Sequence, residues 1–241
     1  MKEEEVIALS NLCNFKADNV SPLKQEASGR KYWRVSNTSD SFVLCYLDPS
    51  IGNHLDFIQI TNSLQNNNIN SVNVIYHNDE HGLTLQEDLG DKDLLSILNT
   101  ENKTELIEKS LDLLIQIQNA DIKNIDRFTD NELTDQMYLF KNIFLKNFLN
   151  IEMNSSIDDL ISITMSNLKK HPWLNCHFDY ERRNLILNEH QSITAIDYQD
   201  MKKGPIGIDM AGILIDHYYQ CDDDSIRNSL KYFSNKINHK Y

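Results

Sequence analysis

The spacing of hydrophobic positions changes once along the chain, close to Gly90. Before this residue, short runs rich in β-branched and aromatic side chains alternate with Gly, Pro, Asn and Asp, a pattern typical of strands joined by turns. After it, apolar residues recur at every third or fourth position, as they do along amphipathic helices. The pattern therefore predicts a β-rich part over residues 1–89 and a mainly helical part over residues 90–241.

Individual elements follow from the same pattern. In the first part we expect helices over 3–12 and 53–64, a hairpin within 31–47, and strands over 72–76 and 83–87. In the second part we expect helices over 94–98, 106–117, 137–149, 157–168, 210–219 and 225–237. One hairpin interrupts these helices, with strands over 184–187 and 192–197 joined by four residues. The predicted fold class is α+β with two lobes, a small β-rich N-lobe (1–89) and a larger helical C-lobe (90–241) that carries the hairpin.

The composition is typical of a globular chain, with 40% hydrophobic and 24% charged residues. No apolar run approaches the roughly 18 residues of a membrane-spanning helix. The N-terminus is acidic and lacks the apolar stretch of a signal peptide. Four cysteines occur without a CxxC pair, which is typical of reduced thiols. We therefore expect a soluble, cytoplasmic protein.

Net charge narrows the class of partner. The chain has 23 Lys and Arg against 36 Asp and Glu, which gives a formal charge of −13. A chain with this charge is repelled by nucleic-acid phosphates and by anionic membrane surfaces. We therefore expect neither nucleic acid nor membrane as a partner, and a small molecule as the substrate.

One stretch carries candidate chemistry. His177 and Asp179 are followed by Asn184, five residues after that Asp, and Asp197 comes thirteen residues later, beyond the expected hairpin. This is the spacing of a kinase catalytic loop and metal-binding turn. Asp179 can orient an acceptor hydroxyl and take its proton. Oxygens of Asn184 and Asp197 suit Mg²⁺, a hard cation, and the hairpin would return both residues to one site. The stretch therefore predicts phosphoryl transfer by positioning and charge neutralisation.

Each of these residues also has a purely structural interpretation, because Asp commonly caps helices and Asn is common in turns. Only their joint spacing is specific. Other constellations are weaker. His217 and Cys221 are spaced as a zinc pair, but no second pair accompanies them. Cys176 beside His177 has no further partner for thiol-protease chemistry. The acidic run at 222–225 is most simply a helix N-terminus.

Six segments carry a family resemblance, in order along the chain: 22–34, 82–91, 136–140, 177–185, 196–200 and 204–209. Together they resemble the aminoglycoside-phosphotransferase-like kinases. Within these, they are most similar to the bacterial cell-wall sugar kinases that phosphorylate the anomeric hydroxyl of N-acetylmuramate and N-acetylglucosamine. The resemblance implies a protein-kinase-like fold of two lobes with ATP and Mg²⁺ between them.

The resemblance also assigns roles that spacing alone does not. It implies a phosphate-covering turn at Ser28, Gly29 and Arg30. It implies a hinge that meets adenine at Gln86, Glu87 and Leu89. His177 and Asp209 are then supports of the catalytic loop. Arg183 and Asp200 are neighbours that either contact the substrate or pair with each other.

Three features depart from the sugar-kinase pattern. Phe178 stands between His and Asp of the catalytic loop, where the subgroup usually has Arg. Gln136 stands where the helical motif usually has an acidic residue, which weakens any sugar contact expected there. The chain ends about twenty residues after Tyr219, whereas relatives continue through helices that wall the acceptor site.

A fourth departure concerns positive charge near the phosphates. Protein kinases carry a phosphate-binding lysine on the strand after the nucleotide turn. The strand expected here, 41–47, has none, and the sugar-kinase subgroup also tends to lack it. Arg30, Lys31 and Arg34 are each compatible with supplying this charge, and equally with being solvated strand residues.

Two functional hypotheses follow. The first is an ATP- and Mg²⁺-dependent kinase acting on an amino-sugar anomeric hydroxyl, on a scaffold that also serves aminoglycosides and choline. The second is a degenerate kinase fold that binds a nucleotide or partner without turnover, which the missing lysine, Gln136 and the early C-terminus motivate. The presence of Asp179, Asn184 and Asp197 together favours the enzyme.

Overall fold

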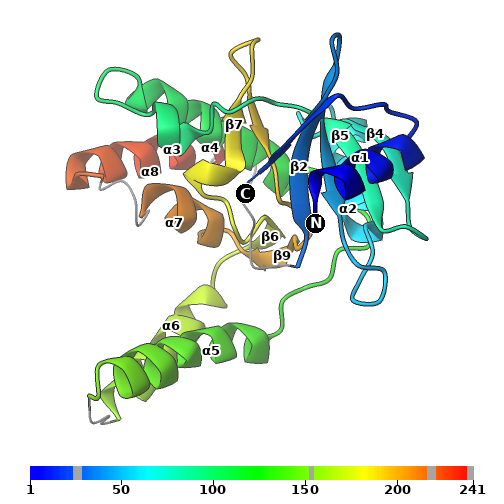
Figure 1. Cartoon of the computed structure of the whole chain (residues 1–241). Helices are drawn as coiled ribbons and strands as arrows, with labels where there is room; N and C mark the ends of the chain where they lie inside the picture. Colours follow the sequence, from blue (N-terminus) through cyan, green and yellow to red (C-terminus); the bar gives the residue numbers. More distant parts are fainter. Residues whose placement is uncertain (24–28, 152–154, 216–220, 238–241) are drawn as a thin grey trace.

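An antiparallel sheet of five strands occupies the N-terminal part of the chain (Figure 1). The computed structural model describes residues 1–23, 29–151, 155–215 and 221–237. The strands are β1 (Asn19–Pro22), β2 (Lys31–Ser36), β3 (Ser41–Tyr46), β4 (Val74–Asn78) and β5 (Leu83–Glu87). Their order in the sheet is β1-β2-β3-β5-β4. The hinge expected after residue 86 therefore leaves the sheet from an inner strand.

The two faces of this sheet have different neighbours. Along β2, Trp33 and Val35 are buried and pack with Val6 of helix α1 (Glu3–Leu12). The alternate residues, Tyr32 and Arg34, point to the opposite face, where they line a cleft. This alternation is what a half-buried strand requires, because successive side chains point to opposite faces. One face of the sheet is thus core, and the other is available for a ligand.

Helix α2 (Leu55–Asn66) packs mainly against the C-terminal part of the chain. Its Phe57 ring stacks on Tyr198, with ring centroids 5.2 Å apart. The Tyr198 hydroxyl lies 2.8 Å from the Thr61 hydroxyl oxygen, in a buried hydrogen bond. The two expected lobes therefore share one hydrophobic cluster at this helix. The division of the chain at residues 89 and 90 stays a prediction.

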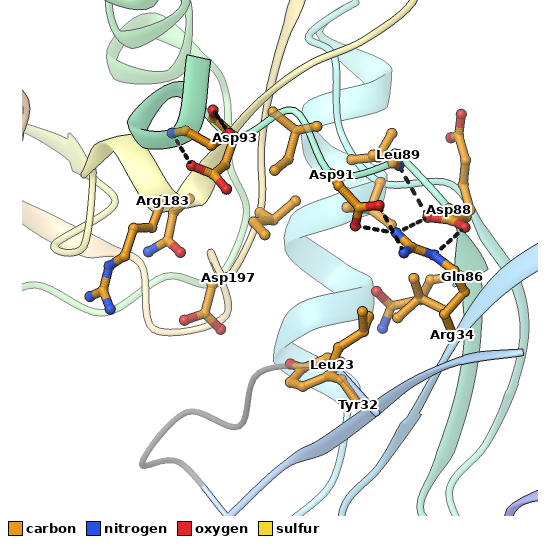
Figure 2. A pocket seen from close by; sticks show the side chains of 18 of the residues that line it. Leu23, Tyr32, Arg34, Gln86, Asp88, Leu89, Asp91, Asp93, Arg183 and Asp197 are labelled. Atoms are coloured by element: carbon orange, nitrogen blue, oxygen red, sulfur yellow. Dashed lines mark hydrogen bonds and ion pairs between the residues drawn. The ribbon is translucent and has the colours of Figure 1, made fainter. Parts of the chain in front are cut away.

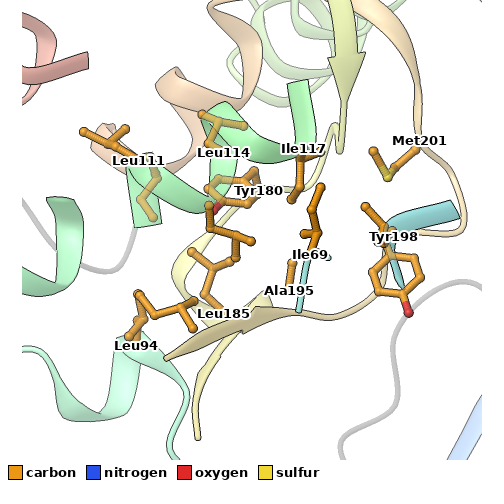
Figure 3. Packing of buried hydrophobic residues seen from close by; sticks show 14 of the residues in the cluster. Ile69, Leu94, Leu111, Leu114, Ile117, Tyr180, Leu185, Ala195, Tyr198 and Met201 are labelled. Carbon is orange, nitrogen blue, oxygen red and sulfur yellow. The ribbon is translucent and has the colours of Figure 1, made fainter. Parts of the chain in front are cut away.

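The C-terminal part is mainly helical. Its helices are α3 (Leu94–Ile97), α4 (Lys103–Asn119), α5 (Asp130–Leu139), the π-helical segment η1 (Phe140–Phe148), α6 (Ser156–Leu168), α7 (Ile208–Leu214) and α8 (Asp223–Ile237). Its strands are β6 (Trp173–Cys176) paired with β9 (Lys202–Pro205), and β7 (Leu185–Leu187) paired with β8 (Ile193–Ala195). Helix α4 places Leu111, Leu114 and Ile117 in the largest core cluster, together with Tyr180 and Leu185 (Figure 3).

Helices α5 and α6 extend away from the rest of the molecule as a helical hairpin (Figure 1). A small cluster of Leu133, Ile161 and Met165 holds the two helices together. Phe128, Trp173 and Phe178 pack against the same cluster, which joins the hairpin to the segment that carries Asp179. Within the described ranges, no helix combines the length and apolar character that crossing a membrane requires.

Most expected elements are confirmed within a few residues, and the differences have local causes. The hairpin within 31–47 and the strand over 83–87 are confirmed. The expected start of a helix at 137 was wrong, because α5 already begins at Asp130, after a capping box between Thr129 and Glu132. Strands β1, β6 and β9 were not expected. In β9, Gly and Pro argue locally against a strand, and pairing with β6 outweighs them.

Candidate active site

The segment from His177 to Asn184 connects β6 to the hairpin β7–β8. The buried His177 ring is held at both nitrogens. Its Nε2 lies 2.9 Å from the carbonyl oxygen of Ile196, and its Nδ1 lies 3.3 Å from the backbone N–H of Asp179. Because that N–H donates, Nδ1 is the acceptor and Nε2 carries the proton that Ile196 accepts. The ring therefore links the loop to the end of β8.

Asp209 holds the same loop from the other side. It lies in the first turn of α7 and is buried. Its Oδ2 accepts the N–H of His177 at 2.7 Å, and its Oδ1 accepts the N–H of Phe178 at 2.8 Å. Burial raises the pKa of the Asp209 carboxyl, although the nearby His177 ring and the two amides work in the opposite direction. Both oxygens are used to position the backbone immediately before Asp179.

Phe178 adopts an unusual backbone conformation, with φ at +66°. This region disfavours bulky side chains, so neighbouring contacts must hold the residue there. The Phe178 ring stacks on Phe128, with centroids 4.3 Å apart, and lies over Gly204 of β9. A Cβ atom on Gly204 would stand 2.5 Å from Cζ of Phe178. The absence of a side chain at Gly204 therefore makes room for the ring.

Gly204→Ala is expected to destabilise the protein by roughly 1–3 kcal/mol, because the new methyl group overpacks the Phe178 ring. The measurement is the free energy of unfolding in urea. Gly207→Ala is a matched control, since no atom lies within 4 Å of a Cβ at Gly207. The double variant Gly204→Ala, Phe178→Ala should lose less than the two single losses added together. Equal losses for the two glycine variants would contradict the packing described.

Asn184 connects Asp179 to the hairpin. Its Nδ2 donates to the carbonyl oxygen and to the carboxylate Oδ2 of Asp179, both at 2.9 Å. Its carbonyl oxygen accepts the N–H of Ile196 at 2.9 Å. Because the Nδ2 group is committed to Asp179, the side-chain Oδ1 is the group that remains for a ligand. Asn184 and Asp197 flank the hairpin and line the same cleft.

Asp197 also has a left-handed backbone, with φ at +63°. Its Oδ1 accepts a hydrogen bond from Gln199 Nε2 at 2.8 Å. Among the described residues, no three His, Cys, Asp or Glu side chains cluster as a metal site would require. One carboxylate and one amide oxygen nevertheless suit Mg²⁺, which commonly takes one or two protein ligands and fills its other positions with water and phosphate oxygens. The donor set of Asn184 and Asp197 fits that ion.

The cleft has a volume of about 510 Å³ and lies between the sheet, the segment after β5 and the hairpin (Figure 2). Apolar side chains approach it from both sides, with Leu23 and Val43 from the sheet and Ile186 and Ile196 from the hairpin. Such walls suit a flat ring, because ligand sites are mostly apolar with a few polar groups. Three of the residues expected at the hinge line the cleft, namely Gln86, Glu87 and Leu89.

Other expected site residues lie around this cleft rather than in its lining. Asp179 is exposed and lines an adjoining cavity of about 160 Å³, together with Glu181, Asp209 and Ile215. Hydrogen bonds link Asn184, in the wall of the cleft, to Asp179, in the wall of the smaller cavity. The Asp179 carboxylate therefore lines one cavity, and the side chains of Asn184 and Asp197 line the other.

The remaining expected residues have separate positions. Gly29 has a φ of +77° and lies in another cavity, beside Ile51. Arg30 is half-buried and directly precedes β2, and Ser28 lies outside the described residues. Arg183 lines the cleft and is paired with Glu181. Asp200 is exposed and accepts from Gln199 Nε2 at 3.3 Å.

The zinc pair weighed from the sequence is not tested, because one of its two residues is not described. His217 lies outside the described residues, and the thiol of Cys221 accepts an N–H of the buried Arg182 at 3.2 Å. The acidic run at 222–225 begins α8 as expected, with Asp222 Oδ1 accepting the N–H of Ser225 at 2.8 Å.

A cluster at the hinge was missed by the sequence reasoning. Arg34 forms ion pairs with both Asp88 and Asp91, and all three line the cleft. Burial alone would raise the pKa of Asp88, but hydrogen bonds from Arg34, Ser41 and the Gly90 N–H together lower it. The signal available in the sequence was the pair of acidic residues around Gly90, directly after an expected strand.

Comparison with known proteins finds one family profile and two curated relatives that each match most of the chain. The profile of the phosphotransferase enzyme family matches residues 19–231. An N-acetylmuramate/N-acetylglucosamine kinase of Pseudomonas putida is 24% identical over 208 residues, covering 84% of this chain and 61% of the relative. A kinase of the same name from Neisseria meningitidis serogroup B is 23% identical and covers 83% of this chain and 62% of the relative. The chain thus spans about three fifths of the length of these relatives.

Solved structures resemble the whole chain. The choline kinase LicA from Streptococcus pneumoniae has a TM-score of 0.70 at 14% identity, covering 95% of this chain and 79% of that protein. The ADP-bound aminoglycoside phosphotransferase APH(2'')-Ib has a TM-score of 0.69 at 15% identity, covering 99% and 84%. These likenesses confirm the expected fold class, a protein-kinase-like α+β fold.

Proposed function

The chain belongs to the phosphotransferase enzyme family, and from this membership we propose that it transfers the γ-phosphoryl group of ATP to the anomeric hydroxyl of an amino sugar. The N-acetylmuramate/N-acetylglucosamine kinases among its relatives support this acceptor class. One observation carries the proposal. Asn184 bonds to the carboxylate of Asp179 while lining the cleft beside Asp197. This links the group that accepts a proton to the groups that meet the phosphates.

Asp179 orients the acceptor hydroxyl and takes its proton as the oxygen attacks phosphorus. Its carboxylate is exposed, and its backbone is fixed by the contacts of His177 and Asp209. An exposed carboxylate on a rigid loop is suited to receive a hydroxyl from a separate cavity. The adjoining cavity of about 160 Å³ is the place where that hydroxyl would approach.

Asn184 and Asp197 would hold Mg²⁺ through their side-chain oxygens. When bound, Mg²⁺ neutralises charge on the phosphate oxygens, which also makes an acidic protein compatible with an anionic nucleotide. Gln199 donates to Asp197 and keeps its carboxylate oriented toward the cleft. Asn184 is oriented in turn by Asp179. The residues therefore arrange one another before a nucleotide binds.

Other residues in and around the cleft would bind adenine and the phosphates. The backbone of Glu87 and Leu89 would meet the base edge, with Leu23 and Ile186 packing against its faces.

Cys45 is buried in β3, and burial raises its pKa to about 12, so it is neutral. Arg30 lies near enough to oppose that increase, and it directly precedes β2, two residues before Tyr32, which lines the cleft. We assign it the positive charge at the phosphates.

A panel of acceptors tests the function. The protein is incubated with ATP, Mg²⁺ and N-acetylmuramate, N-acetylglucosamine, choline or an aminoglycoside, and ADP release and product mass are measured. We expect turnover with an N-acetyl amino sugar and none with its methyl glycoside, which lacks a free anomeric hydroxyl. Turnover of the glycoside, or of choline or aminoglycoside alone, would contradict the acceptor class. ATP binding without any turnover would indicate a binding module.

A further inference from the structure

Arg34 is held by two carboxylates that follow β5. Its Nε lies 2.7 Å from Asp88 Oδ2, and its Nη2 lies 2.9 Å from Asp88 Oδ1. Its Nη2 also lies 2.8 Å from Asp91 Oδ1, and its Nη1 lies 3.1 Å from Asp91 Oδ2. These bonds raise the pKa of the guanidinium, with Asp88 contributing most. A bidentate pair of this kind fixes geometry as well as charge.

The Asp88 carboxylate is fully engaged by this network. Strand β3 lies between β2 and β5, so the Arg34 side chain crosses β3 to reach Asp88. Ser41, at the start of β3, donates its hydroxyl to Asp88 Oδ2 at 2.6 Å. The N–H of Gly90 donates to Asp88 Oδ1 at 3.1 Å. Each oxygen thus accepts two hydrogen bonds, and the Asp88 side chain is only 11% exposed.

Immobilising Asp88 also orients the peptide groups on either side of it. The N–H of Glu87 is used by the sheet, since it donates to the Asn73 carbonyl at 2.8 Å. Among the described residues, no acceptor is bonded to the N–H of Leu89. The carbonyl of Glu87 and the N–H of Leu89 belong to the two peptide groups that flank Asp88, and the sheet does not engage the Leu89 N–H of the described chain.

The position and charge of Arg34 argue against contact with phosphates. A guanidinium between two carboxylates has no net positive charge to offer a polyanion. Arg34, Asp88 and Asp91 also lie on the opposite side of the cleft from Asp197, as Figure 2 shows. The two pairs differ in strength, because the Asp91 side chain is 78% exposed and its pair is screened by water.

We propose that Arg34 is a positioning residue for the nucleotide base, acting through Asp88 on the hinge backbone, with Asp91 as a weaker second contact. The inference rests on the proposed use of this cleft for ATP. In the alternative, Arg34 binds phosphate. The two hypotheses predict different results: loss of Arg34 lowers the affinity for the nucleoside if it positions the base, and the affinity for the phosphate chain if it binds phosphate.

Isothermal titration calorimetry with adenosine, Mg²⁺–ADP and Mg²⁺–tripolyphosphate separates the two. Arg34→Ala should lower the affinity for adenosine and for ADP by about tenfold, which is the effect of one misdirected hydrogen bond. The affinity for tripolyphosphate should not change. Asp88→Asn should give the same pattern, and Asp91→Asn a smaller loss. In kinetics, the KM for ATP should rise about tenfold with kcat unchanged. Lys92→Ala removes an exposed cation near the hinge and serves as the control.

Arg34→Lys provides a second variant in case the alanine variant does not fold. Lysine keeps the charge but cannot form the bidentate pair, so nucleoside affinity should still fall. Equal losses for ADP and tripolyphosphate would overturn the inference in favour of a phosphate contact. Unchanged adenosine and ADP affinity in folded Arg34 variants would also overturn it. If the wild type binds none of the three ligands, the proposed function itself fails.

Discussion

Asp179→Asn is expected to lower kcat for phosphoryl transfer by about 10²–10⁴-fold, because the amide cannot take a proton from the acceptor hydroxyl. Asparagine keeps an oxygen for Asn184 Nδ2, which in the wild type donates to Asp179 Oδ2 at 2.9 Å. The loop geometry should therefore be retained. Asp179 does not line the 510 Å³ cleft, so affinity for ADP should stay close to that of the wild type.

Steady-state turnover and ADP titration measure the two quantities separately. Glu189→Gln is the control, since Glu189 is an exposed acid in the turn between β7 and β8. Its kcat should equal that of the wild type. If Asp179→Asn retained wild-type turnover, Asp179 would have no part in the reaction. A loss of ADP binding of similar size would mean that the carboxylate acts on the nucleotide cleft.

Asp209→Ala is expected to cost about 3 kcal/mol of unfolding free energy, because it leaves one buried and one partly buried backbone N–H group without an acceptor. These are the N–H groups of His177 and Phe178, which donate at 2.7 and 2.8 Å. Turnover should fall as well, since the backbone before Asp179 loses its support. Asp209→Asn keeps one acceptor oxygen and should lie between the alanine variant and the wild type.

Urea denaturation measures this loss, and Asp224→Ala is the matched control. Asp224 is also an acid in the first turn of a helix, α8, but it is exposed. Its removal should lower the free energy of unfolding by only roughly 0.3–1 kcal/mol, which is the usual contribution of a negative charge near a helix N-terminus. Similar costs for the two variants would contradict the support that Asp209 gives to the loop.

The raised pKa of Asp209 adds a dependence on pH. Because the folded pKa lies above the unfolded value of about 3.9, the folded state binds the proton more tightly. This contribution to stability is complete below that value and is lost as the pH rises through the folded pKa. The Asp209→Ala variant should lack this part of the pH dependence when unfolding is measured as the pH is raised from about 4.

Local patterns predicted the elements that depend on neighbouring residues. The β2–β3 hairpin and the helices α4, α6 and α8 follow from periodicity and turn residues within short windows. The spacing of Asn184 and Asp197 around a hairpin is equally local, and both residues line the cleft. Their catalytic and metal-binding roles stay predictions, as does the role of Asp179.

Contacts between distant residues could not be read from such windows. Leu174 of β6 pairs with Gly204, thirty positions later along the chain, and only the folded chain brings these weak strand formers together. The ring of Phe178 occupies the space that Gly204 leaves, which explains how this loop accommodates Phe at that position. The Arg34–Asp88 pair joins residues 54 positions apart and was likewise invisible.

The order of residues by itself determined the two-part α+β pattern, the family resemblance and the spacing of the groups proposed for phosphoryl transfer. Each of these can be recognised from short segments, because helices, hairpins and ligand spacing depend on residues that are close together in the chain. The tertiary structure decided that Arg34 is neutralised by the two carboxylates that follow β5. That outcome depends on which carboxylates meet Arg34 in space, and charges far apart in sequence neutralise one another only after the sheet and its connections have formed.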